Sequence, residues 1–138
     1  AEPLWRNKSL KLAQLYLDEI LAKSYDDSTP LGGLPALTTP SCASLGAEAN
    51  ESRTPTGTEV PFDDVDDYHG TSDSPPLSLV GSLDSSYNSY SVNVTVACDG
   101  STVAATGTTP ANNAKKITVV VTAPNGDAMT LAAYKGNY

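Results

Sequence analysis

The first apolar pattern in the chain is helical and covers residues 4–23. At 100° per residue, one half of the helical wheel is apolar and the other half is polar. The apolar half holds Trp5, Leu10, Leu12, Ala13, Tyr16, Leu17, Ile20 and Leu21. Leu15 is an exception, because it falls among polar side chains such as Lys11. The pattern predicts one amphipathic helix from about residue 3 to about residue 24, with Pro3 in its first turn.

A second pattern, alternation of apolar and polar residues, fills residues 89–138. It predicts three strands, at 90–98, 116–123 and 129–134. The inward-facing positions of the first two are Tyr90, Val92, Val94, Val96, Cys98, Ile117, Val119, Val121 and Ala123. Residues 124–127, Pro-Asn-Gly-Asp, predict a hairpin turn, because Gly and Asn accept positive φ. We therefore expect an antiparallel meander.

The intervening residues, 25–88, are rich in Pro, Gly, Ser, Thr and Asp. A structureless loop of this length is unusual in a compact domain, so we expect loops anchored by short elements. In residues 62–68 an apolar residue recurs at every third position with carboxylates between, which predicts a single helical or 3₁₀ turn. Residues 77–80, Leu-Ser-Leu-Val, favour a short edge strand.

These elements predict a single α+β domain over residues 1–138. An antiparallel sheet needs a cover for its apolar face, and the helix has a matching apolar stripe. A chain of 138 residues buries roughly two-thirds of its unfolded surface, so it needs no metal to fold.

The formal net charge of −8 argues against nucleic acid or anionic lipid as a partner, because such a surface repels phosphate groups. The eight Lys and Arg residues form no binding patch in the sequence. No apolar run approaches the roughly 20 residues that span a bilayer.

The two cysteines, Cys42 and Cys98, are too few for a zinc site. In an acidic chain rich in Ser and Thr, they favour an exported protein with one disulfide. Two buried free thiols in a cytosolic protein are the alternative. In the disulfide interpretation, Cys98 continues the buried face of its strand and the bond holds the loop around Cys42 against the sheet.

The sequence offers little material for catalysis, and we expect no enzyme and no cofactor. His69 is the only histidine, so any catalytic triad or thiol–imidazole pair with Cys42 would have to use it. No Gly-x-Ser-x-Gly motif and no phosphate-binding glycine motif is present.

Asp63, Asp64, Asp66 and Asp67 are weak calcium candidates. Calcium favours several oxygen ligands from a flexible loop, and these four carboxylates lie within five residues. Their spacing does not match the Asp-x-Asp-x-Asp-Gly loop, however. We expect them to be solvated on a turn or to cap backbone amides instead.

Several stretches resemble the minor type IV pilins of the mannose-sensitive haemagglutinin (MSHA) pilus. They are AQLYLDEILAK at residues 13–23, PLGGLP at 30–35, ESR at 51–53, FDDVDDYHG at 62–70, and residues 117–138, from ITV through PNG to AYKGNY. The resemblance spans nearly the whole chain, and the Asp-rich stretch is its most specific part.

The resemblance implies a type IV pilin head, in which the second half of a long helix packs on an antiparallel sheet. The hydrophobic first half, which would anchor the protein in the inner membrane, is absent from this sequence, so residue 1 would be a boundary within that helix. The implied role is a structural subunit in pilus assembly and surface attachment, with other pilins as partners. Its head would be periplasmic before assembly and extracellular afterwards. The alternative is a stand-alone extracellular binding module, for example for carbohydrate.

Overall fold

The computed structural model describes residues 2–32, 42, 44–78, 83–100 and 114–137. Its elements in chain order are α1 (Glu2–Leu21), β1 (Glu51–Ser52), β2 (Val60–Pro61), the 3₁₀ turn η1 (Asp66–Tyr68), β3 (Ser72–Asp73), the 3₁₀ turn η2 (Ser85–Tyr87), β4 (Ser91–Cys98), β5 (Ala114–Thr122) and β6 (Ala128–Gly136). Strands β3, β4, β5 and β6 form an antiparallel sheet in that order, and β1 pairs with β2 in parallel. The predicted α+β class is confirmed.

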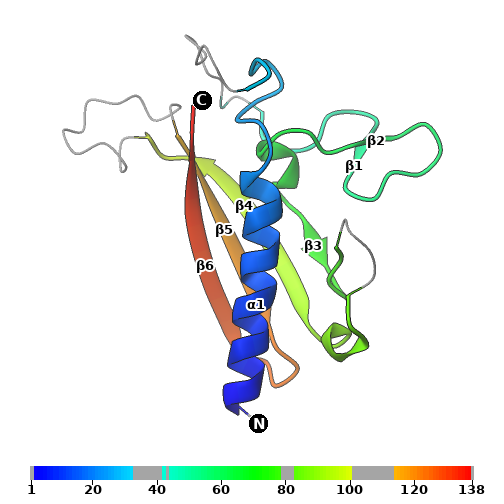
Figure 1. Cartoon of the computed structure of the whole chain (residues 1–138), viewed down its shortest axis with the longest axis vertical. Coiled ribbons are helices and arrows are strands. Elements are labelled where there is room, and N and C mark those ends of the chain that lie inside the picture. Colours follow the sequence, from blue (N-terminus) through cyan, green and yellow to red (C-terminus); the bar gives the residue numbers. More distant parts are fainter. Residues whose placement is uncertain (1, 33–41, 43, 79–82, 101–113, 138) are drawn as a thin grey trace.

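Helix α1 lies along the sheet and packs mainly on β5 and β6 (Figure 1). The predicted stripe supplies most of this contact, since Leu12, Ala13, Tyr16, Leu17 and Ile20 are buried. Leu21 and Trp5 are half-buried against the core. The helix ends at residue 21, earlier than the predicted residue 24.

The burial of two leucine side chains differs from what the helical wheel predicts. Leu10, expected on the apolar side, is 38% exposed, whereas Leu15, expected among polar residues, is half-buried against the core. The buried stripe is centred near Ser9 and Ile20, and Leu10 lies about 90° around the helix from that line. The buried positions, from Leu12 to Leu17 on the wheel, span about 140°, so Leu10 lies just outside them.

The sheet confirms the predicted alternation. Val92, Val94 and Val96 of β4 lie opposite Val121, Val119 and Ile117 of β5, and all six side chains are at most 1% exposed. Strand β6 is more exposed, and its Leu131 and Ala133 are half-buried. The predicted hairpin turn is confirmed, with Gly126 at a φ of +90°.

The middle of the chain contains one confirmed anchor. In the predicted turn at residues 62–68, Val65 and Tyr68 are buried and Phe62 packs edge-on against the Tyr68 ring. The predicted strand at 77–80 is not found at Leu77 or Ser78, and residues 79 and 80 lie outside the described residues. The edge of the sheet is formed by β3, where Ser72 and Asp73 pair with β4.

The predicted disulfide between Cys42 and Cys98 is present, and it joins two positions 56 residues apart. The Cα atoms lie 6.3 Å apart, within the range that a disulfide spans. The bond attaches residue 42 to the end of β4. The alternative of two free thiols is therefore wrong.

Candidate functional site

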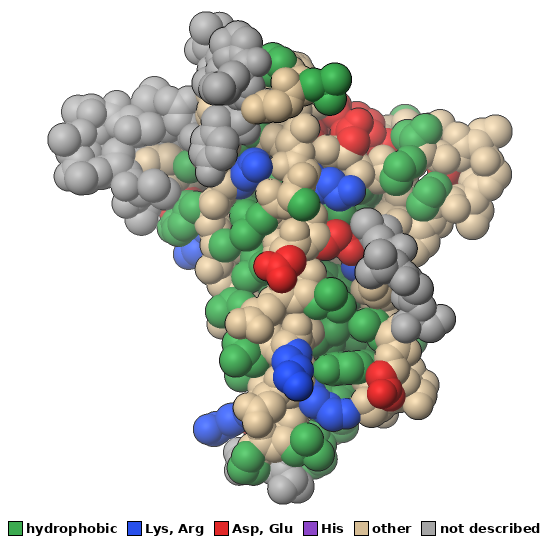
Figure 2. Space-filling model, in the orientation of Figure 1, with side chains coloured by type: hydrophobic (Ala, Val, Ile, Leu, Met, Phe, Trp, Pro, Cys, Tyr) green, Lys and Arg blue, Asp and Glu red, His purple; other side chains and the backbone are tan. Residues whose placement is uncertain are grey.

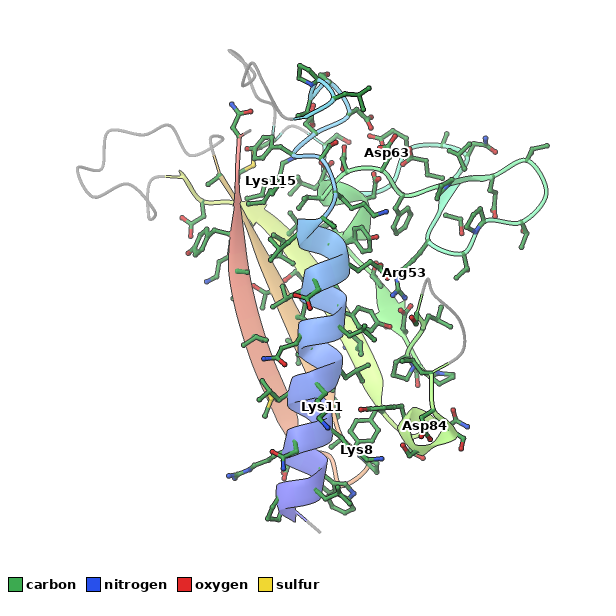
Figure 3. The ribbon with its side chains drawn as sticks, in the orientation of Figure 1. Lys8, Lys11, Arg53, Asp63, Asp84 and Lys115 are labelled. Atoms are coloured by element: carbon green, nitrogen blue, oxygen red, sulfur yellow. A yellow bond between two sulfur atoms is a disulfide. The ribbon has the colours of Figure 1, made fainter. Side chains whose placement is uncertain are left out.

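The acidic segment 62–70 lies beyond the C-terminal end of α1, where it pairs with the chain that leaves the helix. The Ser24 amide donates to the Asp63 carbonyl, and the Val65 amide donates to the Ser24 carbonyl. The buried Val65 and Tyr68 side chains fix the segment from below. The two buried side chains and the hydrogen bonds to Ser24 together hold the carboxylates near the end of the helix, where Asp63 is labelled in Figure 3.

Asp64 and Asp67 cap one another's backbone. Oδ1 of Asp64 accepts hydrogen bonds from the amides of Asp66 (2.9 Å) and Asp67 (3.2 Å). Oδ2 of Asp67 accepts from the amides of Asp63 (2.8 Å) and Asp64 (3.0 Å). This confirms the capping role that the sequence left open, but the side chains are not solvated: Asp64 is 1% exposed and Asp67 is 2% exposed.

Each of these two carboxylates retains one oxygen without a hydrogen bond. Asp64 Oδ2 and Asp67 Oδ1 have no partner among the residues that the structure describes. Burial, and then the neighbouring Asp66 and Asp67 carboxylates, raise the pKa of Asp64 to about 9. The close approach of these buried carboxylates therefore disfavours the ionised form of Asp64.

Asp66 belongs to a different contact set. Lys115 is fully buried, and its Nζ lies 2.8 Å from Asp66 Oδ1 and 3.7 Å from Asp26 Oδ1. The same nitrogen donates to the Tyr25 carbonyl and lies 4.3 Å from the centre of the Tyr25 ring. This lysine from β5 neutralises Asp66 and connects the acidic segment to the sheet.

Four further carboxylates surround Asp64 and Asp67. They are Asp27, Glu48, Glu51 and Asp63. Ligand atoms of Glu48, Asp64 and Asp67 all lie within 4.8 Å of one another, as do those of three other triplets in this group. Partial loss of hydration, followed by contacts with Glu51 and Asp67, raises the pKa of the exposed Glu48 to about 8. These are the residues that could hold a metal ion.

The structure divides the four Asp residues that the sequence singled out. Asp64 and Asp67 point into the carboxylate group, Asp63 borders it, and Asp66 pairs with Lys115. Sequence reasoning missed Glu48 and Glu51, because they lie at least twelve residues before Asp63 and carry no motif of their own.

A second buried polar centre, also missed, surrounds Arg53. Its guanidinium binds Glu19 of α1 through two nitrogens, at 2.9 and 3.0 Å, and Asp73 of β3 at 2.6 Å. It also donates to the Leu77 carbonyl at 2.8 Å, and Arg53 is only 6% exposed. Figure 3 shows Arg53 between α1 and β3. Arg53 therefore holds the helix, the edge strand and two loops together.

The helix also presents a surface. Leu4 is 57% exposed and Leu10 is 38% exposed. Lys8 and Lys11 lie toward the N-terminal end of the helix, with Asp84 near Lys8 (Figure 3), and Figure 2 shows acidic and basic atoms together toward the opposite end. This face of the domain thus has exposed apolar positions on the helix and side chains of both charges along its length.

Two other features bear on ligand binding and catalysis. A pocket of about 320 Å³ between α1 and the β5–β6 turn is lined by Trp5, Arg6, Ser9, Ala123, Asp127, Ala128 and Met129. His69 accepts a hydrogen bond from the Val96 amide through Nδ1, and Cys42 is in the disulfide. The Cys42–His69 pair therefore cannot act as a thiol–imidazole pair.

Comparison with protein-family models, with curated proteins and with solved structures finds no match to this chain. Over the part of the chain that the structure describes, no helix combines the length and apolar character needed to cross a bilayer.

Proposed function

We propose that this protein is a structural, non-enzymatic subunit of a type IV pilus, a minor pilin of the MSHA type that acts in pilus assembly and surface attachment. The observation that carries the proposal is the helix–sheet arrangement. One 20-residue helix lies lengthwise on an antiparallel sheet, buries one stripe and leaves the opposite face exposed. This is the arrangement that the sequence resemblance implies for a pilin head.

In this proposal, α1 is the contact element between subunits. Leu4 and Leu10 are exposed apolar positions on the helix, and burying each against a neighbouring subunit would contribute roughly 1.5–3 kcal/mol if burial were complete. A hydrophobic segment preceding residue 1 would hold the subunit in the inner membrane, with this head in the periplasm. After assembly the head would lie on the extracellular surface of the filament.

The charge distribution supports contacts between successive subunits. Arg6, Lys8 and Lys11 lie in the N-terminal half of α1, and the carboxylate group lies beyond its C-terminal end. Pairing of these basic residues with the carboxylate group of a neighbouring subunit would favour head-to-tail approach of identical or related subunits. Such contacts should weaken as salt increases.

The experiment is incorporation into filaments in a bacterium that carries the full-length gene. Leu10→Glu should leave the protein folded, because this position is at the surface, but should reduce its amount in sheared filaments at least tenfold. Gln14→Glu, which adds the same charge at another exposed helix position, should have no effect. Equal incorporation of both variants, or no wild-type protein in filaments, would contradict the proposal.

The second candidate is an extracellular binding module for carbohydrate, and the pocket at Trp5 is the observation that favours it. A sugar stacks on an aromatic ring and hydrogen-bonds polar neighbours, and this pocket offers Trp5, Arg6 and Asp127. A glycan array separates the two proposals: binding that is lost in Trp5→Ala would favour the module.

A further inference from the structure

The carboxylates at the end of α1 differ from an ordinary acidic surface in one respect. Asp64 and Asp67 are almost completely buried, yet each leaves one oxygen without a hydrogen bond among the described residues. A buried carboxylate oxygen without a partner loses its hydration and receives nothing in return, which costs free energy. A cation bound between these side chains would offset the cost for both carboxylates.

The distances fit one cation. Calcium binds oxygen ligands at about 2.3–2.6 Å, so two ligands on opposite sides of the same ion lie up to about 5 Å apart. Oxygens of Glu48, Asp64 and Asp67 are mutually within 4.8 Å. All three can therefore contact a single ion, and Asp27, Glu51 and Asp63 belong to overlapping triplets that could complete its coordination.

We propose that Glu48, Asp64 and Asp67 form a binding site for one calcium ion, which neutralises the carboxylate group between the end of α1 and the loop that carries β1. The sequence alone ranked calcium below capping. Asp64 and Asp67 can do both, since each uses one oxygen to cap the backbone and leaves the other available. The backbone amides thus hold the two ligands in place before the ion arrives.

The chemistry of the ligands selects among cations. The group contains carboxylates without a histidine or cysteine, so it favours a hard cation over zinc. Magnesium needs near-octahedral geometry at about 2.0–2.1 Å and keeps several waters, whereas calcium accepts more carboxylates at longer and more variable distances. Asp66 is not included, because Lys115 already neutralises it.

The test is calcium titration of the folded protein after dialysis against a chelator, in about 150 mM NaCl to screen weak surface binding. Isothermal titration calorimetry should give one ion per chain. If the dissociation constant is about 10⁻⁴ M, 10 mM calcium should raise the melting temperature by about 5–10 °C. Equal concentrations of magnesium should produce less than half of this rise.

Matched variants separate the site from general acidity. Glu48→Gln removes an exposed ligand without disturbing the core and should weaken calcium binding at least tenfold. Asp67→Asn keeps an oxygen for the Asp63 and Asp64 amides and removes the ligand charge, with the same expected effect. Glu59→Gln, an exposed glutamate outside the group, should bind calcium like the unmodified protein.

Three results would overturn the proposal: no heat of binding with 10 mM calcium, an unchanged affinity in Glu48→Gln, or an equal response to magnesium. Circular dichroism of each metal-free variant shows whether it is folded. The site does not depend on the pilus proposal, because these measurements use the isolated domain and make no reference to filaments.

Discussion

Removing the Arg53 side chain tests whether the buried polar centre stabilises the domain. Arg53 is the one cation in contact with both Glu19 and Asp73, among the ion pairs found in the described part of the chain. In Arg53→Ala, these two carboxylates, whose side chains are only 13% and 12% exposed, lose their partner. The Tyr16 hydroxyl, which donates to Asp73, loses its contact with the guanidinium as well.

The expected cost is about 3–5 kcal/mol, the usual range for removing one partner of a buried ion pair. For a chain of 138 residues, an unfolding entropy of about 2.1 cal/mol/K per residue converts this cost to a fall of about 10–17 °C in melting temperature. Arg53→Lys keeps the charge but loses the two-nitrogen contact with Glu19, so we expect an intermediate loss of about 1–3 kcal/mol.

The assay is urea unfolding followed by circular dichroism, with the thermal midpoint measured in parallel. Lys11→Ala is the control, because it removes a cation from the exposed face of the same helix and should change the free energy of unfolding by less than about 0.5 kcal/mol. A loss below about 1 kcal/mol in Arg53→Ala would refute the reasoning, since it would mean that Glu19 and Asp73 reach water or another partner when the arginine is removed.

Three further predictions concern the packing. Leu17→Asp places a charge between helix and sheet and should lower the free energy of unfolding in urea by several kcal/mol. Lys11→Asp, at the exposed control position, should lower it by less than about 0.5 kcal/mol. Equal unfolding midpoints for the two variants would contradict the packing. Replacing Cys42 and Cys98 by Ser opens a ring of 56 residues and should lower the free energy of unfolding by about 4 kcal/mol, and thiol labelling of the denatured unmodified protein should find no free thiol. Asp66→Asn should destabilise more than Asp66→Asn combined with Lys115→Met, because the single variant leaves a buried ammonium with less neutralising charge; the reverse order would show that Asp66 is not its main partner.

The helix and the three long strands can be predicted from the order of the residues alone. Helix α1 and strands β4, β5 and β6 follow from periods of 3.6 and 2, because one-sided burial requires apolar residues at those intervals along a continuous segment. The turn at residues 124–127 follows from glycine at a position of positive φ. The turn at 62–68 was also predictable, since Val65 and Tyr68 recur at its period.

The buried polar contacts, in contrast, depend on segments that lie far apart in the sequence. Lys115 lies on the inward-facing side of β5 with Ile117 and Val119, where an apolar residue is the usual occupant, and it is fully buried because Asp66, 49 residues away, accepts its charge. Arg53 meets Glu19 across 34 residues, and Glu48 joins Asp64 and Asp67 across a loop. A charged side chain is buried only where partners from other segments neutralise it, and the positions of those partners depend on how the whole chain packs.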